Sequence, residues 1–156
     1  MTEYKKLNNL SGWITFLIAL VVYAITVEDT ASFWDAGEFI AVSSKLEVPH
    51  PPGAPFYLLL GRFFSMFAFG IPENIAHAIN FLSVISSAFT ILFLFWTITY
   101  LSSKIINPNE NQNNKFLVIL SGFIGSLSFT FTDSFWFSAV ESEVYAMSSF
   151  FTAFVF

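Results

Sequence analysis

The sequence predicts an all-α protein, a multi-spanning transmembrane helical bundle with two further helices that lie parallel to the membrane surface. Of its 156 residues, 55% are hydrophobic and only 11% are charged, which is far more apolar surface than a soluble domain of this size needs. Apolar runs of about 18 residues or more are typical of transmembrane helices. The apolar residues are consecutive rather than alternating, which excludes a membrane β-barrel. In hydrocarbon, backbone amides must then be paired within helices.

The first apolar run covers about residues 10–27 and has no small-residue cleavage site, so we expect a retained first span. The runs at about 75–106 and 116–131 are predicted to cross the membrane as well. A further run at about 144–156 has only 13 residues, too few for a hydrocarbon core of about 30 Å. We therefore interpret residues 1–156 as the N-terminal part of one longer transmembrane domain.

The run at about 55–70 decides the topology, and a central Arg62 and two glycines interrupt it. If this run lies in the membrane interface, one face holds Lys5, Lys6, Lys104 and Lys115, as the positive-inside rule requires. The opposite face then holds nearly all the carboxylates, and the loop from Glu28 to Glu73 is extracytoplasmic. If the run crosses, that sorting is lost. We predict the interfacial helix, with Arg62 reaching towards water.

A second interfacial helix is predicted over about residues 33–46, with Ser32 as its N-cap and Asp35 three residues further on. The helix at about 55–70 is expected to start at Pro55, because proline is favoured in the first turn. Between the two helices, the prolines of residues 49–52 restrict the backbone, so this joint can hold His50 in a defined place.

Asp35 and Glu38 are the candidate catalytic residues. Their spacing places both side chains on one face of a helix, where one can act as a general base and the other can tune its pKa. The alternative is a capping role for Asp35 and a solvated Glu38. His50 can bind a phosphate as a cation or a metal ion as a neutral imidazole, or it can be a plain surface histidine.

A second group follows the run at 116–131: Glu141, Glu143 and Tyr145. We expect these side chains on the same face as Asp35, as substrate-binding residues or as ordinary solvated charges. Trp34 can stack on a sugar or belong to an interfacial aromatic belt.

Arg62 and Lys45 are the only cations expected on this face, and either can attract a lipid phosphate. Arg62 can equally be a structural residue of its helix. His77, near Asn80, is interpreted as a satisfied polar residue at a helix end.

Composition excludes several other classes of function. The net charge of −5 and the lack of a basic patch speak against nucleic-acid binding. The absence of cysteine excludes disulfides and thiolate metal sites within residues 1–156. No glycine-rich phosphate loop or metal-spaced histidine cluster is present.

Three segments carry a resemblance to a known family: Phe33–Phe39, His50–Pro55 and Glu141–Tyr145. The first two, which hold Asp35 and the Pro51-Pro52 turn, resemble the N-terminal module of GT-C glycosyltransferases, whose first extracytoplasmic loop carries two membrane-parallel helices and an early acidic residue. The chain is most similar to a Bacteroidetes-type membrane family, long called a domain of unknown function, that is related to an animal transmembrane protein O-mannosyltransferase.

The resemblance implies an inverting transferase that moves a sugar, mannose or similar, from a polyprenyl-phosphate carrier to a hydroxyl acceptor. The acceptor would be protein Ser/Thr or a lipid, and the active face would be the periplasmic side of a bacterial inner membrane. Asp35 would then be the base, while Glu38, Glu141 or Glu143 would orient the substrates. His50, Arg62 or a divalent metal would offset the charge on the leaving phosphate.

A non-enzymatic membrane protein is the rival interpretation, such as a transporter subunit. Transporters usually place ionisable groups or broken helices near the middle of the membrane. Here the charges lie in loops on one face and the expected spans contain almost none. A membrane anchor is a third interpretation, but it leaves the organised loop unexplained.

Overall fold

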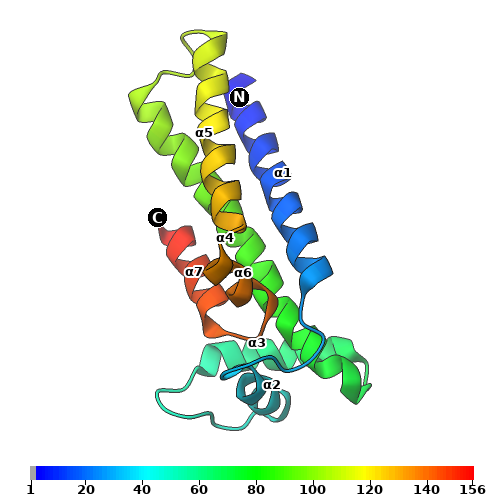
Figure 1. Ribbon diagram of the computed structural model, residues 1–156. Helices are drawn as coiled ribbons and strands as arrows, with labels where there is room; N and C mark the ends of the chain where they lie inside the picture. The colour runs from blue at the N-terminus through cyan, green and yellow to red at the C-terminus, as the bar shows by residue number, and fades with distance from the viewer. Residues whose placement is uncertain (1–2) are drawn as a thin grey trace.

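The structure is a computed structural model that describes residues 3–156, and all regular elements within that range are helices. In chain order they are α1 (Glu3–Thr26), α2 (Ala36–Lys45), α3 (Pro55–Ser65), η1 (Met66–Ala68), η2 (Pro72–Asn74), α4 (Ile75–Ile105), α5 (Gln112–Thr130), α6 (Asp133–Val140) and α7 (Val144–Val155). Helices α1, α4 and α5 run side by side as a bundle, and α2 and α3 form a layer across one end of it (Figure 1). The prediction of an all-α protein is confirmed.

Two helices are long and apolar enough to cross a membrane, namely α1 and the continuous segment Pro72–Ile105. A third span results only if α5 and α6, which meet at a bend of 69°, are counted together. The helical segments Pro55–Ala68 and Val144–Val155 are apolar but shorter. The total number of spans and their orientation in the membrane therefore stay predictions.

The segment between α1 and α4 begins and ends at the same end of the bundle. Asn80 Nδ2, in the second turn of α4, donates a hydrogen bond of 2.7 Å to the Glu28 carbonyl, just beyond α1. One turn earlier, His77 Nδ1 lies 2.9 Å from Asp29 Oδ1. Helix α3 therefore does not carry the chain to the far end of the bundle. The chain stays at one end, which is what the interfacial alternative requires. Its position in a membrane interface stays a prediction.

The main core lies where α1, α4 and α6 meet. It contains Ala19 and Tyr23 of α1, Val84 and Ile91 of α4, and Phe135 of α6, all buried. The Tyr23 hydroxyl donates a 2.8 Å hydrogen bond to a backbone carbonyl at the end of α5, so its one polar atom is satisfied inside this apolar cluster. This packing holds the segment that follows α6 against the end of α1.

The α2–α3 layer has a core of its own, in which Phe39 of α2 and Tyr57 of α3 pack against Leu82 of α4. Gly61 permits the close approach of the two helices, because a Cβ atom there would lie 2.6 Å from Ser43 Oγ. As expected, α3 starts with Pro55 in its first turn. The layer thus packs on α4 and carries α2 to the end of the bundle.

The expected start of the first interfacial helix is wrong. Helix α2 begins at Ala36, not near Phe33, and Ser32 does not cap it. Asp35 occupies the N-cap position but makes no capping hydrogen bond with its side chain. Trp34 has a left-handed backbone with φ of 61°, which a helix cannot continue through. Ser32 instead donates to Glu141, so tertiary contacts override the capping pattern.

Candidate active site

Asn80 of α4 joins the loop after α1 to the segment after α6. Its Nδ2 donates to the carbonyl oxygens of Glu28, at 2.7 Å, and Thr30, at 3.1 Å. Its Oδ1 accepts a hydrogen bond from Ser142 Oγ. Asn80 is 1% exposed and Ser142 is fully buried, so these bonds are shielded from water. They fix the backbone on either side of Ser142, which separates Glu141 from Glu143.

Three carboxylates meet at this point. Asp35, Glu141 and Glu143 line a cavity of about 270 Å³, together with Trp34, Ser138 and Tyr145. The Glu141 carboxylate accepts a hydrogen bond from Ser32 Oγ. These residues are predicted to share one face, and the structure brings them to one cavity. Their functional roles stay a prediction.

Glu143 is the buried member of the group, at 7% exposure. Burial raises the pKa of its carboxyl, and the neighbouring Glu141 and Asp35 charges raise it further. Within residues 3–156, no ion pair includes Glu143. A carboxyl in this setting holds its proton to higher pH than usual.

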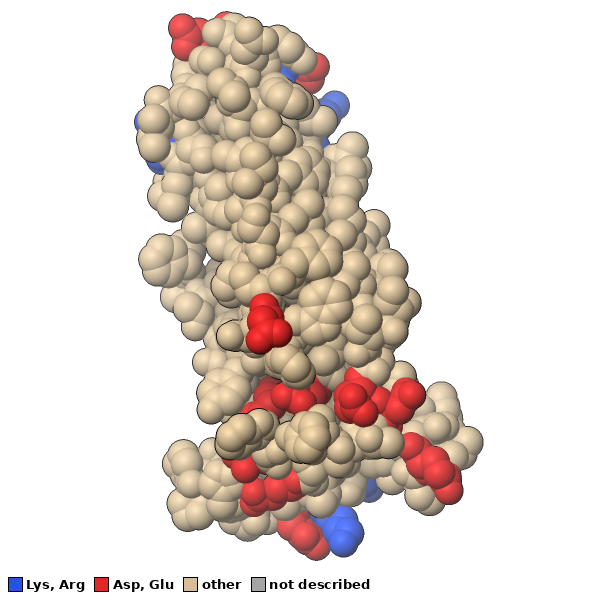
Figure 2. Space-filling model, viewed as in Figure 1, with Lys and Arg blue, Asp and Glu red and all other residues tan. Residues whose placement is uncertain are grey.

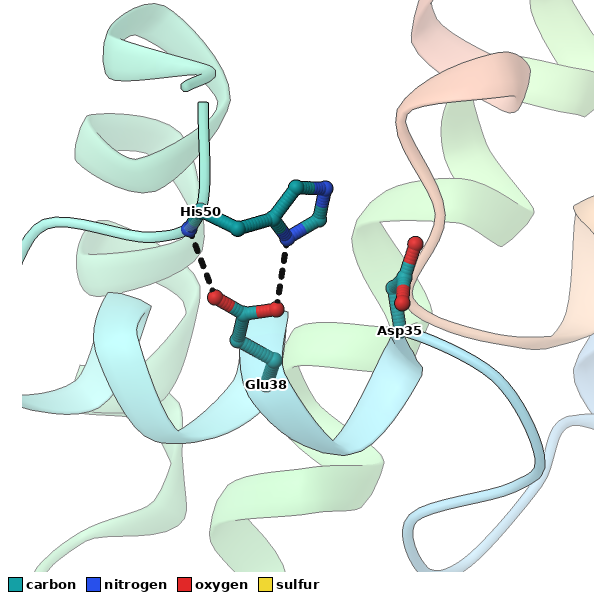
Figure 3. Close-up of side chains that lie close together, drawn as sticks. All are labelled: Asp35, Glu38 and His50. Atoms are coloured by element: carbon teal, nitrogen blue, oxygen red, sulfur yellow. Dashed lines mark hydrogen bonds and ion pairs between the residues drawn. The ribbon is translucent and has the colours of Figure 1, made fainter. Parts of the chain in front are cut away.

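Glu38 and His50 lie next to Asp35, on the side of α2 that faces the proline turn (Figure 3). One Glu38 oxygen accepts a 2.8 Å hydrogen bond from the His50 backbone N–H, and the other lies 2.7 Å from His50 Nδ1. The bond to His50 lowers the pKa of Glu38. The same bond, with a smaller contribution from the Asp35 charge, raises the pKa of His50 and favours the imidazolium. The turn therefore holds His50 in a defined place, as its prolines predicted.

Potential ligand atoms of Asp35, Glu38 and His50 all lie within 4.8 Å of one another. Two carboxylate oxygens and one imidazole nitrogen form a donor set that suits several divalent metal ions. These residues therefore suit the divalent metal ion that the family resemblance allows as one source of positive charge.

Arg62 is not brought to this group. Its Nη1 donates to the Ser44 carbonyl in the last turn of α2, which matches the structural alternative for this residue. Lys45 is exposed at the same end of α2. His77 pairs with Asp29 at the start of α4, as a satisfied polar residue at a helix end.

A larger cavity of about 700 Å³ adjoins the carboxylates. It is lined by acidic and aromatic side chains, including Glu28, Phe33, Asp133 and Phe137, and it shares Trp34 and Glu141 with the smaller cavity. Sequence reasoning missed Glu28 as a site residue and did not assign a role to Asn80. The available signal for Asn80 was an amide embedded in a long apolar run, where an unsatisfied polar group is costly.

A third cavity, of about 810 Å³, lies between α3 and α4 and contains none of the predicted catalytic residues. Phenylalanines dominate its lining, with Asp29, Glu73 and His77 at its polar part. The predicted base Asp35 and the carboxylates of Glu141 and Glu143 line the other two cavities instead.

Comparison with known proteins places the chain in a family. Residues 35–156 match the model described as the Protein O-mannosyl-transferase TMEM260 N-terminal domain. The chain belongs to this family. The match begins at Asp35 and includes Glu38, His50, Glu141 and Glu143. The expected relation to an animal O-mannosyltransferase is confirmed, and the GT-C resemblance is consistent with it.

Two curated relatives carry the TMEM260 name. The chain is 31% identical over 143 residues to "Protein O-mannosyl-transferase tmem260" of Dictyostelium discoideum, which covers 90% of the chain and 15% of the relative. It is 26% identical over 137 residues to "Protein O-mannosyl-transferase TMEM260" of Mus musculus, which covers 87% of the chain and 17% of the relative. The chain therefore spans less than a fifth of either relative. No solved structure gives a significant match.

Proposed function

We propose that this region forms part of the active site of a membrane glycosyltransferase that transfers mannose, or a similar sugar, to a hydroxyl group of a protein acceptor. The donor would be a polyprenyl-phosphate-linked sugar, and the reaction would take place on the extracytoplasmic face. One observation carries the proposal: Asp35, Glu141 and Glu143 gather around a polar cavity in a chain whose relatives are named protein O-mannosyltransferases.

Asp35 is our preferred general base. Its carboxylate is exposed at the start of α2, lines the small cavity and makes no capping bond that would occupy its oxygens. In the proposed step it takes the proton of the acceptor hydroxyl while the acceptor oxygen bonds to C1 of the sugar. The bond from C1 to the carrier phosphate breaks, and the carrier phosphate leaves with the electron pair. Attack opposite the leaving group inverts the configuration at C1.

Glu143 is the second candidate for the base. A general base works best when its pKa is close to the working pH, and burial and two neighbouring carboxylates move the pKa of Glu143 in that direction. With Asp35 as the base, Glu143 would instead orient the acceptor or a sugar hydroxyl from the buried wall of the cavity.

The charge that develops on the leaving phosphate needs a cation. His50 is the nearest cationic side chain to Asp35 that the described contacts show, since the bond with Glu38 favours its imidazolium. As the alternative, a divalent metal held by Asp35, Glu38 and a neutral His50 would supply Lewis-acid stabilisation of that phosphate. The hydrogen bond of Arg62 to the end of α2 makes it a weaker candidate for this role.

The proposed location is an integral membrane protein of the bacterial inner membrane, with the carboxylate end of the bundle in the periplasm. Apolar helices of spanning length support the membrane setting. The sorting of charge supports the orientation, because Lys5, Lys6, Lys104 and Lys115 belong to the helix ends at the opposite end of the bundle.

The direct test is sugar transfer by the full-length protein carrying Asp35→Asn. Transfer from a radiolabelled polyprenyl-phosphate mannose to a threonine-containing peptide should fall by about 10²–10⁴-fold, as expected for a lost general base. Glu47→Gln is the matched control, since Glu47 is exposed in the same loop and lines neither cavity of the site. Near-normal transfer by Asp35→Asn would remove Asp35 from the role.

A further inference from the structure

We propose that the 700 Å³ cavity beside the carboxylates binds the acceptor polypeptide and favours segments with Lys or Arg next to the reacting hydroxyl. This inference rests on the proposed function, because it names the acceptor of the same site. It commits to a cationic stretch of polypeptide rather than to the anionic lipid carrier.

The charge of the cavity is the first argument. Glu28, Asp133 and Glu141 contribute three carboxylates to its lining, and no Lys or Arg is among the lining residues. Acidic side chains gather where the bundle meets the α2–α3 layer (Figure 2). Such a wall attracts cationic groups and repels the phosphate of a lipid carrier.

The aromatic side chains of the cavity are the second argument. Phe33, Trp34 and Phe137 are all exposed, Trp34 to 92%, although they lie beside an acidic surface. Aromatic rings next to carboxylates can stack on Lys and Arg side chains and on the apolar parts of a peptide. Trp34 is also held in a left-handed backbone with φ of 61°, a costly conformation for a bulky residue that persists only when its surroundings enforce it.

Continuity with the reacting groups is the third argument. Trp34 and Glu141 line both cavities, so the larger one opens beside the smaller one. The smaller cavity contains Asp35 and also Glu143, which is more than nine-tenths buried and belongs to no ion pair in residues 3–156. A chain lying in the larger cavity can therefore present its hydroxyl to these carboxylates. A volume of about 700 Å³ is within the usual range for ligand pockets.

The side chains of Glu28 and Asp133 can be neutralised without removing the structural bonds of this region. It is the backbone of Glu28 that donates to Val140 and accepts from Asn80, and Gln at position 28 still accepts from Thr30. The test variant is the full-length protein with Glu28→Gln and Asp133→Asn combined. The matched control is Glu73→Gln, which removes an exposed carboxylate from a different cavity.

The experiment measures transfer to three peptides that differ only in Lys, Gln or Glu beside a single Thr. For the unmodified protein we expect KM to be about 3–10-fold lower for the Lys peptide than for the Gln peptide, which corresponds to two partly exposed charge pairs. The Glu peptide should have the highest KM. In the double variant, the KM values for the Lys and Gln peptides should become nearly equal. The Glu73→Gln variant should keep the lower KM for the Lys peptide.

A binding measurement separates this inference from the proposed function. Fluorescence anisotropy of the labelled peptides on the purified full-length protein needs no turnover. Preferential binding of the Lys peptide without sugar transfer would contradict the proposed function but support the assignment of the cavity. Sugar transfer without any preference, or a preference that the double variant retains, would overturn the assignment. Preference in detergent that disappears in lipid nanodiscs would assign the cavity to lipid and also overturn it.

Discussion

Two buried ionisable side chains, one at each end of the bundle, have different electrostatic surroundings. Lys115 of α5 is 8% exposed, and its ammonium group lies 2.7 Å from the carboxylate of Glu3 in α1. Glu143, at the other end, is 7% exposed and has no cationic partner within residues 3–156. The charges that act on it are the carboxylates of Glu141 and Asp35, which have the same sign.

The two settings differ in their effect on stability, since one buried group has a partner of opposite charge and the other has neighbours of the same charge. A buried charge is costly unless it is paired, so the Lys115–Glu3 contact is what a structural site requires. A buried carboxyl kept among like charges reduces stability, and such groups gather at sites that bind or react. The comparison therefore supports a functional end and a structural end of one bundle.

The largest difference is expected in cysteine labelling, which locates the two ends of the bundle relative to the membrane. Single cysteines at Glu47 and Glu73 should react with an impermeant maleimide in intact cells, while a cysteine at Asn113 should not, because these positions lie at opposite ends of the bundle. All three positions are exposed, whereas Ser142 is buried and unsuited to labelling. The cysteines are placed in a full-length protein without other cysteines.

Reaction at Asn113 and protection at both glutamate positions would put the carboxylate end in the cytoplasm. The proposed extracytoplasmic reaction would then be wrong. Opposite results at Glu47 and Glu73 would contradict the return of α4 to the end of α1.

Glu143→Gln should separate activity from stability. We expect transfer to fall on the order of 10²-fold if Glu143 acts in proton transfer. The same change should raise the unfolding temperature at alkaline pH. Since burial and like charges raise the pKa of the native Glu143 above 4.5, unfolding releases its proton, and the stability of the unmodified protein declines as pH rises through that pKa.

Thermal unfolding of both proteins from pH 4 to pH 9 checks this prediction. The gain should be largest above the native pKa and vanish in acid. Lower stability of Glu143→Gln at all pH values would show that Glu143 has a hidden favourable partner, and the comparison with Lys115 would fail.

Asn80→Ala should destabilise the protein by about 1–3 kcal/mol, because it leaves buried polar partners in the loop after α1 and at Ser142 unsatisfied. Ser86→Ala is the matched control. Ser86 is also buried in α4, but it bonds only to the Leu82 carbonyl of its own helix. Denaturant unfolding in detergent measures both effects, and transfer per folded molecule should fall only for Asn80→Ala. Equal losses in the two variants would remove the special role of Asn80.

The smallest expected effect is the pH dependence of the Glu38–His50 pair. The native pKa of His50 is raised above 6.5, so its contribution is complete below 6.5 and is lost as pH rises through the raised value. The native pKa of Glu38 is lowered below 4.5, so its contribution is lost as pH falls through the lowered value. His50→Gln should therefore reduce stability most between about pH 4.5 and pH 6.5.

Thermal unfolding at pH 5.5 and pH 9 compares the unmodified protein with His50→Gln. The exposure of both side chains keeps the difference small. A difference that is larger at pH 9 would contradict the assigned ion pair.

Periodicity and composition predicted the helices well because each helix must be apolar along its length to pack or to cross lipid. The start of α3 at Pro55 followed from proline geometry alone, and the grouping of Asp35 with Glu141 and Glu143 followed from counting spans. These features depend on local chemistry or on the order of elements along the chain.

The remaining features depend on contacts between distant residues. Ser32 looked like a helix cap, but its partner is Glu141, 109 positions away. The sequence left two roles open for Arg62, a phosphate ligand or a structural residue, and the α2–α3 contact turns it towards the Ser44 carbonyl. The role of Asn80 was hidden for the same reason, since all three of its hydrogen-bond partners lie at least 50 positions away.

The long reach of Asn80 has a consequence for biosynthesis. Its amide oxygen has no partner until Ser142 has been made, 62 positions later, which takes about 3–12 s at roughly 5–20 residues per second. Helix α4 is completed within that interval, and its apolar helix then contains a polar side chain whose amide oxygen has no protein partner. The segment from Glu141 to Glu143 can pack against α4 only after α5 and α6, which lie between them in the sequence, have left the ribosome. Slowing or interrupting synthesis between positions 80 and 142 would therefore prolong a state in which the helices exist and the carboxylates have not yet come together.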